Sequence, residues 1–343
     1  MIFLKILFIL IIVVMVFVIF SYIFASSILN KSFTRMGEDQ ATMFIKYDEI
    51  KDKYERSEYE FKSKKNTLKG YLYKSSSKDD LIIYVHGLCA GHQGYLSDIT
   101  ALVNKGYNVF TYDFTATGAS SGKRFCGLNQ QLYDLRNAIK FLKSQNLFSY
   151  KNIYLYGHSM GGYAVACIDD EIISSIVSIS GFDSHIDELL SVFCANKSKF
   201  FKLFANTVIR IKYFFDLGFK YDYKAHKNLQ STNTRTLIIH GNNDELVKID
   251  TISIISKKDL INNDKVSYLE ITDPMHNSHN SIIASNECVL YQKQITEIFD
   301  KAIEEKKSRK EALEISTQNL DRFKFNQANQ DMIDLVDKFY KEK

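Results

Sequence analysis

Apolar residues fill the beginning of the chain and then recur in short, separated runs. From Ile6 to Ala25 the sequence contains no charged side chain. A helix of this length spans about 30 Å, the thickness of the hydrocarbon core of a bilayer. A cleaved signal peptide needs an apolar core of only about 7–15 residues before a small-residue site, and residues 25–27 could serve as that site. We predict an uncleaved single-pass anchor over residues 1–29, with a signal peptide as the alternative.

After the anchor, a charged stretch at residues 30–56 is expected to be a linker, and short β-branched runs then alternate with helical patterns. The expected strands are a pair around a turn at 64–67 and the runs 81–86, 107–113, 152–157, 174–180, 234–241 and 265–271. Helical patterns occupy 95–105, 128–144, a segment from residue 159, and 281–299. Such alternation predicts an α/β domain over 57–300, with a mostly parallel central sheet flanked by helices.

Two segments interrupt the alternation. Residues 183–232 are amphipathic and rich in phenylalanine, and we expect them to form a helical cap insertion over the site. The aromatic side chains of this insertion could form an apolar roof for an acyl chain, or simply pack the cap onto the body. Residues 301–343 begin as a charge run and end with an apolar stripe at helical spacing, from Met332 to Tyr340. They predict a charged helical tail whose stripe packs on the domain.

The composition excludes several classes of function. The net charge is +4 and the basic residues are dispersed, so no nucleic-acid footprint is present. The five cysteines have no paired spacing, which argues against a disulfide framework and against a zinc site. No metal and no organic cofactor is expected.

The charges that flank the anchor give opposing indications of its orientation. Lys5 precedes the apolar run, whereas Lys31 and Arg35 follow it, so a count of positive charges favours a cytoplasmic domain. A very short N-terminal tail with a lysine, however, usually stays inside. We therefore favour the extracytoplasmic side for the domain, although the unpaired cysteines weigh against it.

A candidate nucleophile lies in the run "YLYGHSMGG" at 154–162. An apolar strand leads directly into Gly157-His158-Ser159-Met160-Gly161, and a helix is expected from the serine onward. This G-x-S-x-G element is a tight strand-to-helix turn, and a Cβ at either glycine would clash. The turn raises the hydroxyl of Ser159 above the sheet at a helix N-terminus, where developing negative charge is favoured. The alternative is a plain glycine-rich turn.

A serine nucleophile needs a base, and the base needs an orienting acid. In a nucleophile elbow the acid and then the base follow downstream, each just beyond a strand end. Asp244 follows the run ending near residue 241, with Glu245 as a possible substitute. His276 follows the run 265–271, and His279 is the alternative base. We predict His276 because it lies nearer the strand end, and a zinc role for the two histidines lacks a third ligand.

Acyl transfer also needs backbone donors for the oxyanion. We expect one from the amide of Met160, the residue after the nucleophile, and another from the amide of Leu88 in the loop after the strand at 81–86. Cys89 in the same loop is a weak candidate nucleophile, because no glycine elbow surrounds it.

From about residue 58 to residue 299 the chain resembles the α/β-hydrolase superfamily, in particular its monoacylglycerol lipase and lysophospholipase-like (serine aminopeptidase S33-type) branch. The residues that carry this resemblance are "VHGLCAGHQGY", "YDFTATGASSG", "YGHSMGG", "IIHGNNDELV" and "DPMHNSH". In that branch the first histidine of the H-x-x-H pair is catalytic, which implies His276. The second motif departs from its D-x-R-G pattern with Thr115 and Ala116, so the internal contacts of that loop are in doubt.

The sequence as a whole predicts a membrane-anchored serine hydrolase that cleaves carboxylic esters, with a lipid or another amphiphile as substrate. The resemblance implies an acyl-enzyme on Ser159 and no cofactor. A peptidase or thioesterase with the same triad is the first alternative, because members of one fold act on different substrates. A non-catalytic binding protein that keeps the fold is the second.

Overall fold

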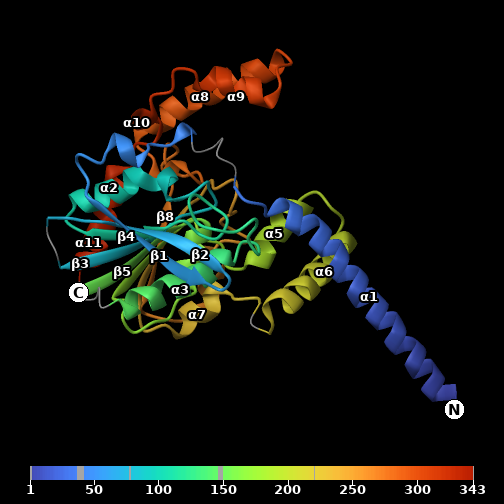
Figure 1. Cartoon of the computed structure of the whole chain (residues 1–343). Helices are drawn as coiled ribbons and strands as arrows, with labels where there is room; N and C mark the ends of the chain where they lie inside the picture. Colours follow the sequence, from blue (N-terminus) through green and yellow to red (C-terminus); the bar gives the residue numbers. More distant parts are fainter. Residues whose placement is uncertain (1, 37–41, 77–78, 146–149, 220, 343) are drawn as a thin grey trace.

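An eight-stranded sheet forms the centre of the molecule (Figure 1). The structure, a computed structural model, describes residues 2–36, 42–76, 79–145, 150–219 and 221–342. The strand order is β1-β2-β4-β3-β5-β6-β7-β8. The strands are β1 (Arg56–Ser63), β2 (Asn66–Tyr73), β3 (Asp80–Val85), β4 (Asn108–Tyr112), β5 (Asn152–His158), β6 (Ser175–Ile179), β7 (Arg235–Gly241) and β8 (Val266–Ile271).

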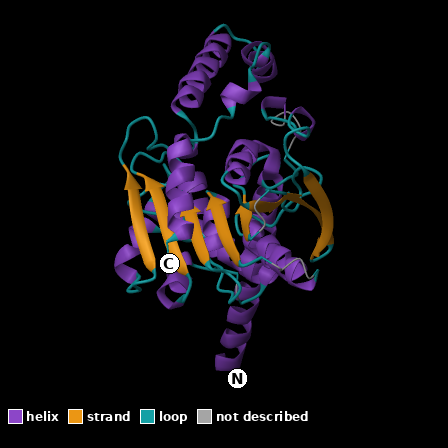
Figure 2. Cartoon of the chain, turned by 90° about the vertical axis from the view of Figure 1, so that its left-hand side faces the viewer, coloured by secondary structure: helices purple, strands orange, loops and turns teal. Residues whose placement is uncertain are grey.

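The sheet is parallel from β4 to β8, and the hairpin β1–β2 joins it in antiparallel orientation through β2 and β4. The central strands are apolar on both faces because helices cover both sides, as is usual for parallel sheets (Figure 2). In β3, Leu81, Ile83 and Val85 belong to one core, and Ile82 and Tyr84 belong to the other. The predicted α/β fold with a mostly parallel sheet is confirmed.

The helices divide between the two faces of the sheet and the outside of the domain. The first core contains side chains of α3, α4 and α7, and the second contains side chains of α2 and α11. The α-helices are α1 (Ile2–Ser32), α2 (Leu96–Asn104), α3 (Gln130–Ser144), α4 (Met160–Ala166), α5 (His185–Cys194), α6 (Lys199–Leu217), α7 (Ala225–Ser231), α8 (Asn286–Glu304), α9 (Arg309–Thr317), α10 (Arg322–Phe325) and α11 (Gln330–Lys341).

The last helix, α11, is an integral part of the domain. The ring of Tyr340 stacks on Tyr154 of β5 with 4.4 Å between centroids, and its hydroxyl donates a hydrogen bond to the carbonyl of Leu155 at 2.7 Å. Tyr107 donates a hydrogen bond to Asp337 at 2.8 Å. The helices α8 and α9, by contrast, stand away from the sheet (Figure 1). The C-terminal part of residues 301–343 therefore packs on the sheet through its apolar stripe.

The segment that follows α1 is fixed to the domain. Phe33 is buried against Phe125, the ring centroids being 5.2 Å apart, and its carbonyl accepts the amide of Phe125 at 3.0 Å. The amide of Arg35 donates to the carbonyl of Lys123 at 2.9 Å, and that of Met36 to Ala116 at 3.1 Å. Residues 33–36 of the expected linker are therefore packed on the domain. The sequence alone does not reveal this docking, because the partners are 80 to 92 positions away along the chain.

The insertion expected at 183–232 contains α5, α6 and α7. All three helices contribute side chains to the first core, among them Leu189 of α5, Tyr213 of α6 and Leu229 of α7. We keep the name cap for α5 and α6. The helix α6 lies beside α1 (Figure 1). Within the described residues, α1 is the one helix long and apolar enough to cross a membrane, with a mean hydropathy of 3.4 over its most apolar window.

Candidate active site

Ser159 lies in the turn between β5 and α4, with the backbone that a nucleophile elbow requires. Its φ is 56° and its ψ is −119°, a strained conformation for a residue with a side chain. A Cβ at Gly157 would overlap the carbonyl of Gly161, and a Cβ at Gly161 would overlap the carbonyl of Val85. The glycines are therefore required by close backbone approach, and they leave the serine side chain projecting from the turn.

His279 bridges Ser159 and Asp244. The hydroxyl of Ser159 lies 2.9 Å from Nε2 of His279, and Nδ1 of His279 lies 2.7 Å from Oδ2 of Asp244. With Nδ1–H donating to the carboxylate, Nε2 is left free to accept the serine proton. His279 and Asp244 are buried, whereas Ser159 remains partly accessible. This is the geometry of a nucleophile, a base and an orienting acid.

His276, which we predicted as the base, lies outside this arrangement. Its amide closes a turn with the carbonyl of Asp273 at 2.9 Å, and its Nδ1 lies 3.1 Å from the carbonyl of Ser281. The prediction is corrected in favour of the alternative, His279. The physical reason is the strand order: β8 is three strands from β5, which is roughly 14 Å at normal strand spacing. The turn closed between Asp273 and His276 uses up chain length on the way back, so the connection reaches Ser159 only at His279.

Asp244 follows β7 as predicted, and its neighbours hold it as a carboxylate. Oδ1 accepts the amides of Leu246 at 3.0 Å and Val247 at 2.7 Å. Burial acts to raise the pKa of Asp244, but hydrogen bonds from His240 and His279 outweigh burial and place the pKa below its ordinary value. A negative charge at this position stabilises the imidazolium that forms when His279 takes a proton.

Glu245, the substitute we considered for Asp244, has a different contact. Its Oε2 accepts the backbone amide of His279 at 3.1 Å, so it holds the main chain of the base rather than its ring.

The loop after β3 approaches the nucleophile closely. A Cβ at Gly87 would lie 3.1 Å from Cβ of Ser159, so the backbone around Leu88 is next to the reacting hydroxyl. The amide of Met160 is the first of α4 and faces no intrahelical acceptor. Among the described residues, neither the amide of Leu88 nor that of Met160 donates a hydrogen bond. Both expected donors therefore have their N–H groups available for an oxyanion.

His158 links the elbow to the base, a contact that the sequence did not suggest. Its Nε2 donates to the backbone carbonyl of His279 at 2.9 Å, and its Nδ1 accepts the hydroxyl of Tyr95, also at 2.9 Å. Burial lowers the pKa of His158 to about 3, so the ring is neutral and its tautomer is set by these two partners. His158 thus positions His279 without touching the reacting atoms.

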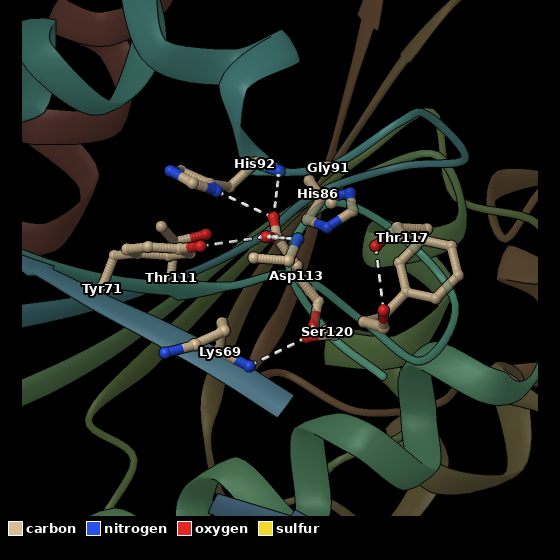
Figure 3. A network of polar contacts seen from close by, with 12 residues as sticks. Lys69, Tyr71, His86, Gly91, His92, Thr111, Asp113, Thr117 and Ser120 are labelled. Carbon is tan, nitrogen blue, oxygen red and sulfur yellow. Dashed lines mark hydrogen bonds and ion pairs between the residues drawn. The ribbon is translucent and has the colours of Figure 1, made fainter. Parts of the chain in front are cut away.

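Asp113 is buried and organises the loop at 113–122, whose sequence departs from the D-x-R-G pattern (Figure 3). Oδ1 of Asp113 accepts both the amide and Nδ1 of His92 at 2.8 Å, and Oδ2 accepts the amide of Ala119 at 2.9 Å. Burial opposes ionisation, yet His92 lowers the pKa of Asp113 to about 2. The loop at 113–122 is therefore joined to the loop at 86–92, which contains Leu88.

This chain has Thr115 where the D-x-R-G pattern has an arginine. The guanidinium of Arg35 contacts the same loop instead. Its Nη1 donates to the carbonyls of Ser120 at 2.8 Å and Gly122 at 3.3 Å, and its Nη2 donates to the carbonyl of Gly118. The segment that follows α1 thus holds a loop that is connected, through Asp113, to the site.

A cavity of about 480 Å³ lies beside the site. Leu88 and Asn280, the residue after His279, are among its lining residues, and the other walls come from α2 and from the C-terminal helices. The lining is largely apolar in α8, α9 and α10, from which the contributing side chains include Ile295, Phe299, Leu313 and Phe325. The C-terminal helices therefore build a wall that the sequence led us to expect from the insertion at 183–232.

Cysteine and metal chemistry find no support in the described residues. Cys89 is buried, with its thiol 3.0 Å from the carbonyl of Gly91, and burial raises its pKa to about 12, which disfavours the thiolate. No group of three or more His, Cys, Asp or Glu side chains in the described chain could hold a metal ion.

Comparisons with known proteins agree with the fold. The model of the family described as alpha/beta hydrolase fold matches residues 80–222, which include Ser159 but end before Asp244 and His279. The polyketide transferase ATR5 of Stachybotrys chlorohalonatus is 27% identical over 116 residues, which make up 33% of this chain. The match spans only 39% of that curated relative.

The Pyrococcus furiosus esterase Pf2001, in two crystal forms, is similar in structure to this chain. One has a TM-score of 0.52 at 21% identity, covering 69% of this chain and 88% of the esterase. The other has a TM-score of 0.52 at 20% identity, covering 68% and 86%. Likeness at this level of identity concerns the fold. Together with the eight-stranded sheet and the matched family model, it shows that the chain has the α/β-hydrolase fold.

Proposed function

We propose that the chain is a membrane-anchored serine hydrolase that cleaves carboxylic esters of lipid-like substrates. The observation that carries the proposal is the hydrogen-bonded series Ser159–His279–Asp244 on a nucleophile elbow. A binding protein has no need of a strained serine with a buried histidine and carboxylate in line behind it.

In this mechanism Oγ of Ser159 attacks the ester carbonyl and forms a new C–O bond, while its proton passes to Nε2 of His279. The carbonyl oxygen becomes an oxyanion, which the amides of Leu88 and Met160 stabilise. Asp244 stabilises the imidazolium. Collapse of the tetrahedral intermediate breaks the bond to the alcohol oxygen, which takes the proton from His279 and leaves.

Water then resolves the acyl-enzyme by the same steps. His279 accepts a proton from the water as the hydroxyl attacks the acyl carbon, and returns it to Oγ of Ser159 as the carboxylic acid leaves. Because every proton in this scheme passes through His279, replacing that residue should affect both acylation and deacylation.

The lipid preference rests on the surroundings of the triad. The cavity next to Leu88, whose C-terminal wall includes Ile295, Phe299 and Leu313, has room for part of an acyl chain, and α1 has the length and hydropathy of a membrane anchor. A panel of p-nitrophenyl esters of increasing chain length, with thioesters and aminoacyl amides beside them, tests this preference. Activity confined to short water-soluble esters would reject the lipid substrate. Faster turnover of thioesters or amides would favour the thioesterase or peptidase alternative.

Fluorophosphonate labelling of the full chain in detergent tests the triad. We expect the unmodified protein to label, whereas Ser159→Ala and His279→Ala do not. His276→Ala is the matched control, since that histidine lies on the same connection after β8 but does not contact Ser159, and it should label normally. Loss of labelling in His276→Ala with retention in His279→Ala would refute the assignment of the base. Folded protein that does not label at all would favour the non-catalytic binding protein.

A further inference from the structure

The anchor helix α1 continues into the folded part of the chain as one side of a helix pair with α6. The residues of α1 that are buried are Ser21, Ala25 and Leu29, which recur every four residues on one side of the helix. Two of these side chains are small and permit close approach, as at helix contacts within membranes. The pair is further joined by a hydrogen bond from Tyr22 to Asp216 at 3.1 Å.

The contact with α6 lies within the apolar run of α1, not beyond it. The ring of Tyr22 meets Phe215 edge-on with 5.9 Å between centroids, and that of Phe24 lies 6.4 Å from Phe204. Tyr22 and Phe24 belong to the uncharged run that ends at Ala25. Since that run is about as long as the bilayer hydrocarbon is thick, its last residues lie at the membrane boundary when α1 spans the bilayer. The helix α6 must then lie at that boundary as well.

The helix α6 exposes an aromatic face of the kind that such a position requires. Its buried side, which includes Val208, Ile209 and Tyr213, packs on the body. Its outer side exposes apolar residues at helical spacing, with Phe200 81% and Phe215 59% exposed. We call this outer side the aromatic face of α6, and it consists of the exposed Phe200, Leu203, Phe214 and Phe215, with Phe204 and Ile211 partly buried beside them.

Exposed phenylalanines and lysines next to α6 extend the aromatic face. Phe219, just beyond α6, is 89% exposed, and Phe193 of α5 is exposed too. The lysines Lys197, Lys199 and Lys202 are exposed around the start of α6. Contiguous apolar patches of this kind are rare on surfaces that face water, and basic residues beside them suit anionic lipid headgroups.

We propose that the aromatic face of α6 is embedded in the boundary between headgroups and acyl chains of the bilayer that α1 crosses. The cap of the hydrolase is then an in-plane membrane helix. This inference rests on the proposed function only in taking α1 as a membrane span. It does not depend on the identity of the triad or on the substrate.

The connection between α1 and the domain prevents α6 from turning away from the membrane. Immediately after α1, Phe33 is buried and Arg35 is hydrogen-bonded to the loop at 118–122. The domain is thus held on α1 at two places, the pair with α6 and the docked residues 33–36. Asp216, which lies at the contact, forms an ion pair with Lys212 and so does not present an unpaired charge to the boundary.

Tryptophan fluorescence tests this placement directly, because the chain contains no tryptophan. The full-length protein is reconstituted into vesicles of phosphatidylcholine with some phosphatidylglycerol, with and without bromine on the acyl chains. Single variants Phe200→Trp and Phe219→Trp report on the cap, and Phe17→Trp reports on the middle of α1. Phe323→Trp is the matched control, an exposed phenylalanine on α10.

We expect bromine to reduce the emission of Phe200→Trp and Phe219→Trp, with blue-shifted maxima, and to leave Phe323→Trp unaffected. Quenching of Phe17→Trp without quenching of the two cap variants would overturn the inference while leaving the anchor intact. Absence of quenching at Phe17→Trp would refute the anchor and the inference together. Blue-shifted emission at the cap that bromine does not quench would indicate burial against another protein chain, and would also overturn it.

Discussion

Nε2 of His158 donates a hydrogen bond to the backbone carbonyl of His279 at 2.9 Å. The residue that precedes the proposed nucleophile thus holds the main chain of the proposed base, and the elbow and the loop after β8 form one unit. Positions in a triad tolerate little displacement, because reacting atoms must be within hydrogen-bond reach. Four predictions test the site and its supports.

His158→Ala should reduce kcat by about 10–100-fold with little change in KM, because the base loses its support while the substrate pocket stays intact. Steady-state kinetics on a soluble ester measures this. Tyr95→Phe is the informative partner variant: it removes the hydroxyl that Nδ1 of His158 accepts but keeps the bond to His279, so its effect should be smaller. If both variants raised KM by the same factor and left kcat unchanged, the positioning role of His158 would be contradicted.

Asp244→Asn should lower kcat by about 10³–10⁴-fold, because the amide cannot stabilise the imidazolium or enforce the tautomer of His279. Glu245→Gln keeps an oxygen that can accept the amide of His279, so it should reduce kcat only slightly. Ester hydrolysis by the two variants decides between the carboxylates. A larger loss of kcat in Glu245→Gln than in Asp244→Asn would identify Glu245 as the orienting acid.

Arg35→Ala should lower the free energy of unfolding by about 1–3 kcal/mol, since three backbone carbonyls lose a charged donor. It should also reduce kcat, because the loop at 113–122 supports the loop that contains Leu88. Denaturant titration and ester kinetics measure the two effects. Lys31→Ala removes an exposed cation from the end of α1 and serves as the control. Identical behaviour of both variants would show that Arg35 supports nothing beyond charge balance.

Asp98 predicts a pH dependence of stability. Burial raises its pKa to about 7, although the hydroxyl of Tyr84 donates to it at 2.8 Å. Below about pH 4 the carboxyl of Asp98 is protonated in both the folded and the unfolded states, so it adds no pH dependence to the free energy of unfolding. Between about pH 4 and 7 the unfolded state loses the proton that the folded state keeps, so the free energy of unfolding falls as pH rises, by at most about 1.4 kcal/mol per pH unit.

Asp98→Asn should remove this dependence. The unfolding free energy of the original protein minus that of Asp98→Asn should therefore fall from pH 4 to 7 and then level off. Denaturant titrations at several pH values measure it, with exposed Asp259→Asn as the control for the loss of one carboxyl. A difference that stays constant across this range would mean that Asp98 is ionised in the folded protein.

The sequence by itself determined the features that depend on neighbouring residues. Apolar β-branched runs gave the strands, and the glycines around Ser159 indicated the elbow, because tight turns exclude a Cβ locally. Asp244 could be predicted because it directly follows β7, where the site of a parallel sheet opens. The length and lack of charge of the run from Ile6 to Ala25 predicted a long apolar helix in the same way, and α1 is that helix.

Only the tertiary structure decided the choice between His276 and His279, because it depends on how far the chain must travel from β8 back to β5. Contacts between distant segments were equally inaccessible from the sequence: the guanidinium of Arg35 on the loop at 118–122, the packing of α1 on α6, and the wall of the cavity built by the C-terminal helices. Periodicity shows which side of a helix is apolar, but the partner of that side is set by packing in three dimensions.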